Sequence, residues 1–204
     1  MKKILALTLT LVMMLSFAAC GNSDKGNDEV TTDPAVTTDA PEETKVVDPT
    51  DALNSIYKAL PDDFKFPAGG GDANNMVMDG AGKFAFDGEE NAAAIDAVLG
   101  FPVALVTKID NAASIMHMMN ANTFTAGAYH FVSAADASAS VETIKSNILA
   151  RQWMCGFPET LIIVDLGGNT LLTAFGNGQV IDAVKTATLN TIEGSTVVVE
   201  TPIG

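Results

Sequence analysis

The stretch TLIIVDLGGNTLLTAF, residues 160–175, decides the fold class of this chain because it holds two apolar runs around a short polar break. Gly167, Gly168 and Asn169 form the break, and these residue types tolerate the positive φ values that tight hairpin turns require. The two apolar runs have the length of strands and are rich in Leu, Ile, Val and Thr. The stretch therefore predicts two antiparallel strands joined by a tight turn.

Further strands and helices are predicted on both sides of this hairpin. Upstream, residues 113–121 and 126–134 predict a second hairpin. Helical periodicity is clearest in residues 138–154, where Val141, Ile144 and Ile148 recur at the spacing of one helix face. The other predicted elements are helices over residues 51–60, 89–99 and 178–190, an edge strand over residues 196–200, and a glycine-rich loop over residues 67–88 with at most one short strand.

The order of these elements predicts the architecture. Strand, strand, helix, strand, strand, helix favours an α+β domain. We expect a mainly antiparallel sheet of four to five strands with helices packed on one face. We expect Thr50 or Asp51 to cap the first helix, and Asp136 or Ser138 to cap helix 138–154, because short polar side chains satisfy the first N–H groups of a helix.

The N-terminal residues predict a lipoprotein signal peptide over residues 1–19. Lys2 and Lys3 precede an apolar core, and the small pair Ala18-Ala19 stands directly before Cys20. This order resembles a bacterial lipobox, in which the cysteine receives a diacylglyceryl group and becomes the new N-terminus. Phe17 departs from the aliphatic residue that the pattern prefers three residues before the cysteine, and a secretory signal cut after Ala19 is the alternative. We expect Cys20 to be the lipid-attachment residue.

Composition divides the rest of the chain into a linker and a domain. Residues 20–50 are rich in Thr, Asp and Pro and poor in large apolar residues, so they cannot offset the entropy of ordering their backbone. We expect a lipidated cysteine and a disordered tether there. Residues 51–204 are long enough for one hydrophobic core and form the predicted extracytoplasmic α+β domain.

Charge and cysteine content limit the partners. The chain has 11 Lys and Arg against 25 Asp and Glu, and its net charge of −14 repels phosphate backbones. Nucleic acid is therefore excluded as a partner, and the expected membrane contact is the lipid anchor alone. Once Cys20 is lipidated, Cys155 is the only remaining thiol, so no intrachain disulfide can form and the role of Cys155 stays open. We expect a monomer on the outer face of the bacterial cytoplasmic membrane.

A family resemblance agrees with this placement. The chain carries a methionine-rich strand ending in Met118-Met119, a helix closing on Arg151 with Trp153 just after it, and a Pro158-Glu159 pair before a strand, glycine turn, strand and helix. Between Ile115 and Leu189 it resembles a family of Gram-positive bacterial lipoproteins known as a domain of unknown function. The residues 154–157 depart from that family. The resemblance implies a lipid-anchored extracytoplasmic protein and supplies no activity.

The strongest chemical hint is a group of soft metal ligands. Met116, His117, Met118 and Met119 are consecutive, and Met76 and Met78 are two residues apart. Thioether and imidazole ligands suit Cu(I), so a soft-metal (copper) binding protein is one alternative function. In a strand, however, Met116 and Met118 point to one face and His117 to the other, so the segment cannot converge on a metal by itself. From the sequence alone we therefore expect no copper uptake, and whether these residues contact a metal is left open.

Other motifs predict no catalytic site and no cofactor. His117 and His130 are the only histidines in the sequence, and no nucleophile pattern accompanies them. An envelope enzyme is therefore only the second alternative function, behind soft-metal binding. The pair Arg151 and Trp153 suits either a ligand clamp or helix-end packing, and packing is the more usual role. We expect a membrane-anchored binding or interaction module that is not an enzyme and whose ligand or protein partner is unknown.

Acidic and amide residues in the glycine-rich loop also suggest a calcium site. Asp72, Asn74, Asn75, Asp79 and Asp87 carry suitable oxygens, but Met76 stands where an EF-hand loop needs a ligand. We expect a loop with solvated acids instead. Phe175-Gly176-Asn177-Gly178 lacks the third glycine of a dinucleotide-binding turn, so Asn177 is expected to act as a helix cap.

Overall fold

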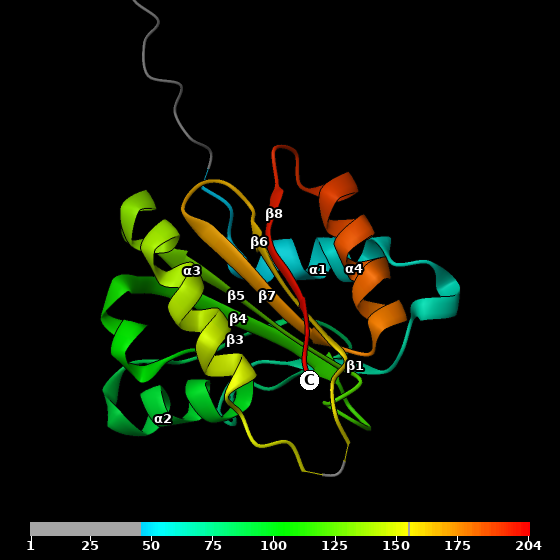
Figure 1. Cartoon of the computed structure of the whole chain (residues 1–204), viewed down its shortest axis with the longest axis horizontal. Coiled ribbons are helices and arrows are strands. Elements are labelled where there is room, and N and C mark those ends of the chain that lie inside the picture. Colours follow the sequence, from blue (N-terminus) through cyan, green and yellow to red (C-terminus); the bar gives the residue numbers. More distant parts are fainter. Residues whose placement is uncertain (1–45, 155) are drawn as a thin grey trace, which may run out of the picture. The chain divides into compact units, whose positions relative to one another are not determined.

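The computed structural model describes residues 46–154 and 156–204 (Figure 1). The predicted signal peptide, Cys20, nearly all of the linker and Cys155 lie outside the described residues. The helices are α1 (Pro49–Ala59), η1 (Asp62–Phe64), α2 (Gly88–Leu99), η2 (Val103–Lys108), α3 (Ala134–Leu149) and α4 (Gly178–Thr191). The strands are β1 (Ala68–Gly70), β2 (Val77–Met78), β3 (Gly82–Lys83), β4 (Ile109–His117), β5 (Phe124–Phe131), β6 (Thr160–Asp165), β7 (Thr170–Gly176) and β8 (Thr196–Pro202). Among these residues, no helix is long and apolar enough to cross a membrane.

The strands form one antiparallel sheet, and the predicted α+β class is confirmed. Its order is β2-β1-β4-β5-β7-β6-β8, and β3 pairs with β4. The sheet has eight strands rather than four to five. The five long strands β4 to β8 are those that the apolar runs predict, and the excess comes from three short strands inside the glycine-rich loop. These contain two or three residues each, and both β1 and β3 pair with the distant strand β4, so their own sequence carries little strand signal.

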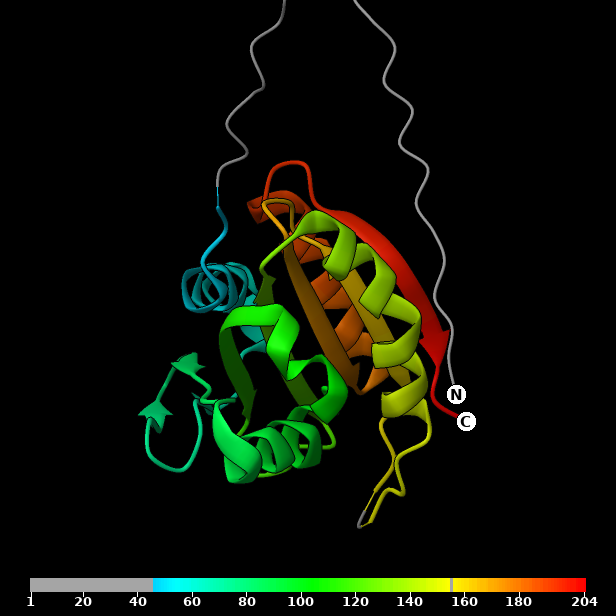
Figure 2. The ribbon, with the colours of Figure 1, turned by 90° about the vertical axis from the view of Figure 1, so that its left-hand side faces the viewer.

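Helices cover both faces of the sheet, which corrects the expectation of one covered face. In Figure 1 the long strands run between α2 and α3 on the left and α1 and α4 on the right; Figure 2 gives the perpendicular view. Ile162 packs in the core under α1 and α4, whereas its neighbour Ile163 packs in the core under α2 and α3. The uninterrupted apolar run of β6, residues 161–164, is typical of a strand buried on both faces, where no polar face is needed.

The first hairpin lies a few residues earlier than predicted. β4 ends at His117 because its Nδ1 accepts hydrogen bonds from the backbone N–H groups of Met119 and Asn120, at 3.1 and 3.2 Å, and these begin the turn. β5 ends at Phe131 because Ser133 caps α3, its Oγ accepting from the N–H of Asp136 at 3.1 Å. Ser133 therefore replaces the expected caps Asp136 and Ser138.

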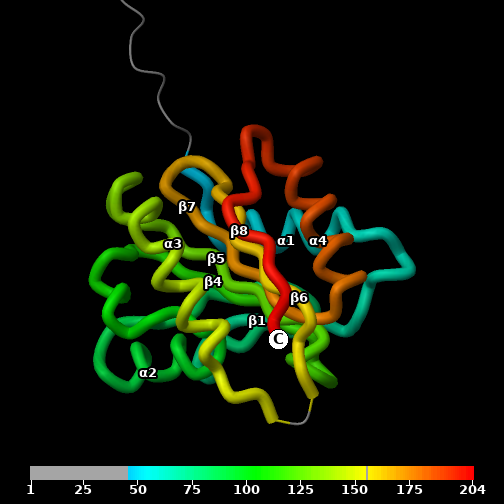
Figure 3. The backbone as a smooth tube through the Cα atoms, viewed as in Figure 1, coloured from blue at the N-terminus to red at the C-terminus, as the bar shows by residue number. Residues whose placement is uncertain are grey.

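Helix α1 also begins earlier in the sequence than expected. Asp48, not Thr50 or Asp51, is the cap: its Oδ1 accepts from both of their N–H groups, at 2.9 and 3.0 Å. Its Oδ2 accepts from Asn111 Nδ2 on β4 at 2.9 Å. Residues 48–50 thus belong to the folded domain, and the tube in Figure 3 shows the described residues 46–48 leading into α1.

The Asp48→Ala substitution is expected to lower the free energy of unfolding by about 2 kcal/mol, because it removes the N-cap of α1 and the bond to Asn111. Urea unfolding followed by the fluorescence of Trp153 measures this change. Asp48→Asn is the matched control, since Asn caps helices as well as Asp and is expected to keep most of the stability. Equal losses in the two variants would contradict the capping role.

Candidate functional site

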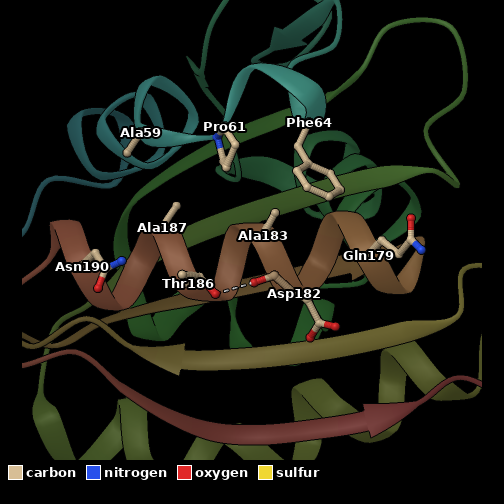
Figure 4. Close-up of a pocket in the computed structure, with 9 residues that line it drawn as sticks. All are labelled: Ala59, Pro61, Phe64, Gln179, Asp182, Ala183, Thr186, Ala187 and Asn190. Atoms are coloured by element: carbon tan, nitrogen blue, oxygen red, sulfur yellow. Dashed lines mark hydrogen bonds between the residues drawn. The ribbon is translucent and has the colours of Figure 1, made fainter.

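The candidate site is a groove between the end of α1, the short helix η1 and the outer side of α4 (Figure 4). Its volume is about 620 Å³, which lies within the range of small-molecule sites. Pro61 ends α1 and turns the chain into η1, which places Phe64 against α4. The groove is lined by Ala59, Pro61, Phe64, Gln179, Asp182, Ala183, Thr186, Ala187 and Asn190.

Two rows of side chains on α4 give the groove an apolar wall and a polar rim. Ala183 and Ala187 are one helical turn apart and point toward Pro61 and Phe64. Their small side chains leave the space between the helices open. On the other row, the Thr186 hydroxyl donates to the carbonyl oxygen of Asp182 at 2.9 Å. An apolar wall beside a polar rim suits a ligand that has an apolar side and a polar side.

Charge around the groove is negative or already neutralised. The carboxylate of Asp182 lies 3.0 Å from Lys185 Nζ, and Glu200 holds the same ammonium at 2.6 Å. These two carboxylates raise the pKa of Lys185, so it stays charged and paired. Lys65, directly after η1, pairs with Asp62 at 2.8 Å. Both of these nearby cations are therefore already paired with carboxylates, and neither is free to bind an anionic ligand.

The predicted soft ligands separate as the strand pattern requires. His117 lies on the α1 face, where its ring stacks on Phe66 with centroids 5.0 Å apart. Its Nδ1 already accepts two backbone N–H groups. Met116 and Met118 lie on the opposite face. Among the described residues, no group of three or more His, Cys, Asp or Glu side chains is placed to hold a metal ion.

Arg151 and Trp153 perform the packing role rather than forming a ligand clamp. The guanidinium of Arg151 donates to the carbonyl oxygens of Ala97 and Val98 at the end of α2, at 2.6 and 3.3 Å. It also lies 4.9 Å from the ring centroid of Trp153, which in turn packs on Phe175. The indole N–H of Trp153 has no hydrogen-bond partner among the described residues. The pair therefore joins α2 to the sheet.

Asp72 is a buried structural residue, which corrects the expectation of a solvated acid at this position, whereas Asp79 and Asp87 are exposed as expected. Its carboxylate accepts from the N–H groups of Asn74, Asn75 and Ala85 at 2.7, 3.0 and 2.7 Å. Burial opposes its ionisation, but the donors of Ala85, Asn75 and Asn74 outweigh that cost and hold the pKa of this carboxyl below its usual range. Asp72 therefore holds two parts of the loop together, residues 74–75 and residue 85, through its own hydrogen bonds.

The remaining histidine forms a pair with an acid. His130 Nδ1 contacts the carboxylate of Asp110 on the neighbouring strand β4. In the described part of the chain no hydroxyl is hydrogen-bonded to that ring. Asn177 caps α4 as expected, its Oδ1 accepting from the N–H groups of Gln179 and Val180.

Comparisons with known proteins found no relative of this chain. No protein-family model matches it, and neither the curated proteins nor the solved structures contain a match.

The groove was missed from the sequence. Ala183 and Ala187 look like an ordinary helix interior, and Phe64 stands in a segment without periodicity. The one usable signal was the alternation of two rows on residues 178–190, with small apolar side chains on one row and polar side chains on the next.

Proposed function

We propose that this chain is a lipid-anchored extracytoplasmic binding module, attached through Cys20 to the outer face of the bacterial cytoplasmic membrane and acting as a monomer. The groove beside α4 is its ligand site. The observation that carries the proposal is the open, apolar-walled groove, whose volume of about 620 Å³ suits a small molecule or a short peptide segment. The order of basic residues, apolar core and small residues before Cys20 supports this location.

The chemistry of the groove selects its ligand class. Apolar contact with Phe64, Ala183 and Ala187 favours a hydrophobic segment, while the amides of Gln179 and Asn190 at the two ends can bond polar groups. Asp182 and the acids of η1 disfavour a negative charge. We therefore infer a neutral or cationic ligand with an apolar segment. We assign no catalytic role and no cofactor, because Asp110 is the one hydrogen-bond partner of the His130 ring within residues 46–154 and 156–204, and Arg151 is engaged by helix-end carbonyls.

Two dyes that share one aromatic skeleton test the groove. N-phenylnaphthylamine is neutral, and anilinonaphthalene sulfonate carries a negative charge. Residues 42–204 form one compact unit of the chain and serve for this test. We expect the neutral dye to fluoresce on binding to them and the anionic dye to bind more weakly. The Ala183→Leu substitution fills the groove and is expected to weaken the neutral dye by about tenfold, equivalent to about 1.4 kcal/mol.

A substitution of the same kind elsewhere controls this test. Ala93 is exposed on α2, on the opposite face of the sheet, so Ala93→Leu is expected to leave dye binding unchanged. Leu and Ala both favour helix, so neither variant should unfold its helix. Binding that Ala183→Leu leaves intact, or that favours the anionic dye, would contradict the assignment of the groove.

A further inference from the structure

Three methionines project from one face of the sheet near its β2 edge. Strand β1 lies between β2 and β4, and its Gly69 is directly opposite Met78 on β2 and Met116 on β4. Directly opposed residues of antiparallel strands project their side chains to the same face. Met118 follows Met116 by two residues and therefore shares that face. Its N–H continues the ladder by donating to the carbonyl oxygen of Pro67 at 2.9 Å.

The missing side chain of Gly69 leaves space between these methionines, and Met118 occupies it. A Cβ atom at Gly69 would overlap the Sδ atom of Met118, so this sulfur lies directly over the glycine backbone. Met78 and Met116 flank the same point from either side, with backbones about 10 Å apart across two strand spacings. Methionine has three rotatable bonds before its methyl group, which lets both sulfur atoms swing toward that point.

The cluster is open to solvent. Met78 is 65% exposed and Met118 41% exposed, whereas apolar side chains are ordinarily covered. The net charge of −14 attracts cations to the molecule as a whole. His117 takes no part, because it projects from the opposite face and its Nδ1 already accepts two backbone N–H groups.

We propose that Met78, Met116 and Met118 form a thioether site for a soft monovalent cation, Cu(I). Thioether sulfur selects Cu(I) over hard cations, and three such ligands around one point suit its low coordination number. The sequence alone argued against uptake because only Met116 and Met118 shared a face. Strand β2 supplies the third ligand. The site lies on the face opposite α1 and α4, so it is independent of the proposed groove.

Silver titration tests this site without redox chemistry, since Ag(I) has the same preference for soft ligands. The full chain, purified in a neutral detergent, carries Cys20→Ser and Cys155→Ser in every sample so that no thiol competes. Isothermal titration calorimetry is expected to show one Ag(I) per chain. Met78→Leu, Met116→Leu and Met118→Leu are each expected to lower the affinity by about 100-fold, because changes even outside the ligand shell cost 10–100-fold.

Met119→Leu is the matched control. Met119 is more exposed than Met118 and adjoins it, but it lies in the turn beyond β4. Leu replaces Met at nearly constant volume, so all four variants are expected to keep the parent's melting temperature. The proposal is overturned if the parent binds no Ag(I), if the three substitutions leave the affinity unchanged, or if Met119→Leu lowers it equally.

Discussion

Ile162→Ala and Ile163→Ala will each lower the free energy of unfolding by about 2–5 kcal/mol, the range for removing a buried isoleucine side chain. These neighbours point to opposite faces of β6, and both are 0% exposed. Ile162 packs beneath α1 and α4, and Ile163 packs beneath α2 and α3. Both substitutions therefore open a cavity in a helix-covered core. Urea unfolding of residues 42–204, followed by the fluorescence of Trp153, measures both losses.

An exposed strand residue provides the baseline for this pair. Val198 on the edge strand β8 is 44% exposed, so Val198→Ala is expected to cost no more than about 0.5 kcal/mol. A sheet with one solvated face would make one of the two isoleucine substitutions as mild as Val198→Ala. That result would contradict the two-faced core.

Metabolic labelling with a palmitate analogue is expected to mark the full chain and to be lost completely in Cys20→Ser. Lipidation of the cysteine is the step that attaches the acyl chains, and burial of each CH₂ contributes about 0.8 kcal/mol to membrane binding. Gel fluorescence of cells that express each variant measures the label. The expectation rests on the basic residues, apolar core and Ala18-Ala19 pair before Cys20.

The second cysteine of the chain serves as the control for labelling. Cys155→Ser removes the other thiol and is expected to keep the full label. Label that persists in Cys20→Ser would show that the acyl chains are attached to another residue, and it would contradict the assignment of Cys20 as the lipid anchor. Label lost in both variants would show that the readout follows protein amount rather than attachment.

Local signals predicted the elements whose hydrogen bonds close within a short stretch. The hairpin at residues 160–175 became β6 and β7, with Gly167, Gly168 and Asn169 at positive φ as the turn requires. The end of α2 was equally readable, because Gly100 adopts the left-handed conformation that ends helices. Turn chemistry depends on adjacent residues, so the sequence alone is sufficient at these two positions. The N-caps of α1 and α3 were not predicted in the same way, because several short polar residues compete for the cap and the structure uses Asp48 and Ser133.

Strand pairing between segments that are far apart in the sequence could not be predicted in this way. Nothing in Gly82 or Lys83 indicates a strand, since β3 exists only because β4 lies beside it. The covering of the second face was likewise missed, although the unbroken apolar run of β6 carried that signal. A helix-strand order alone does not say on which face each helix packs.

The candidate sites depend on the same distant contacts. Met78 and Met116 share a face only because both lie opposite Gly69 on β1, and Ala183 faces a groove only because η1 places Phe64 opposite it. The sequence could identify methionines as soft ligands and could separate His117 from Met116 by strand alternation. It could not supply the third sulfur or the second wall of the groove.

The central claim is that the groove beside α4 binds the ligand, and chemical-shift mapping tests it most directly. Residues 42–204 labelled with ¹⁵N are titrated with N-phenylnaphthylamine while the backbone amide signals are followed. We expect the largest shifts at Ala59, Phe64, Ala183 and Ala187, and none at Ala93 on the opposite face. Shifts confined to α2 and α3, or no shifts at dye concentrations that saturate fluorescence, would contradict the account.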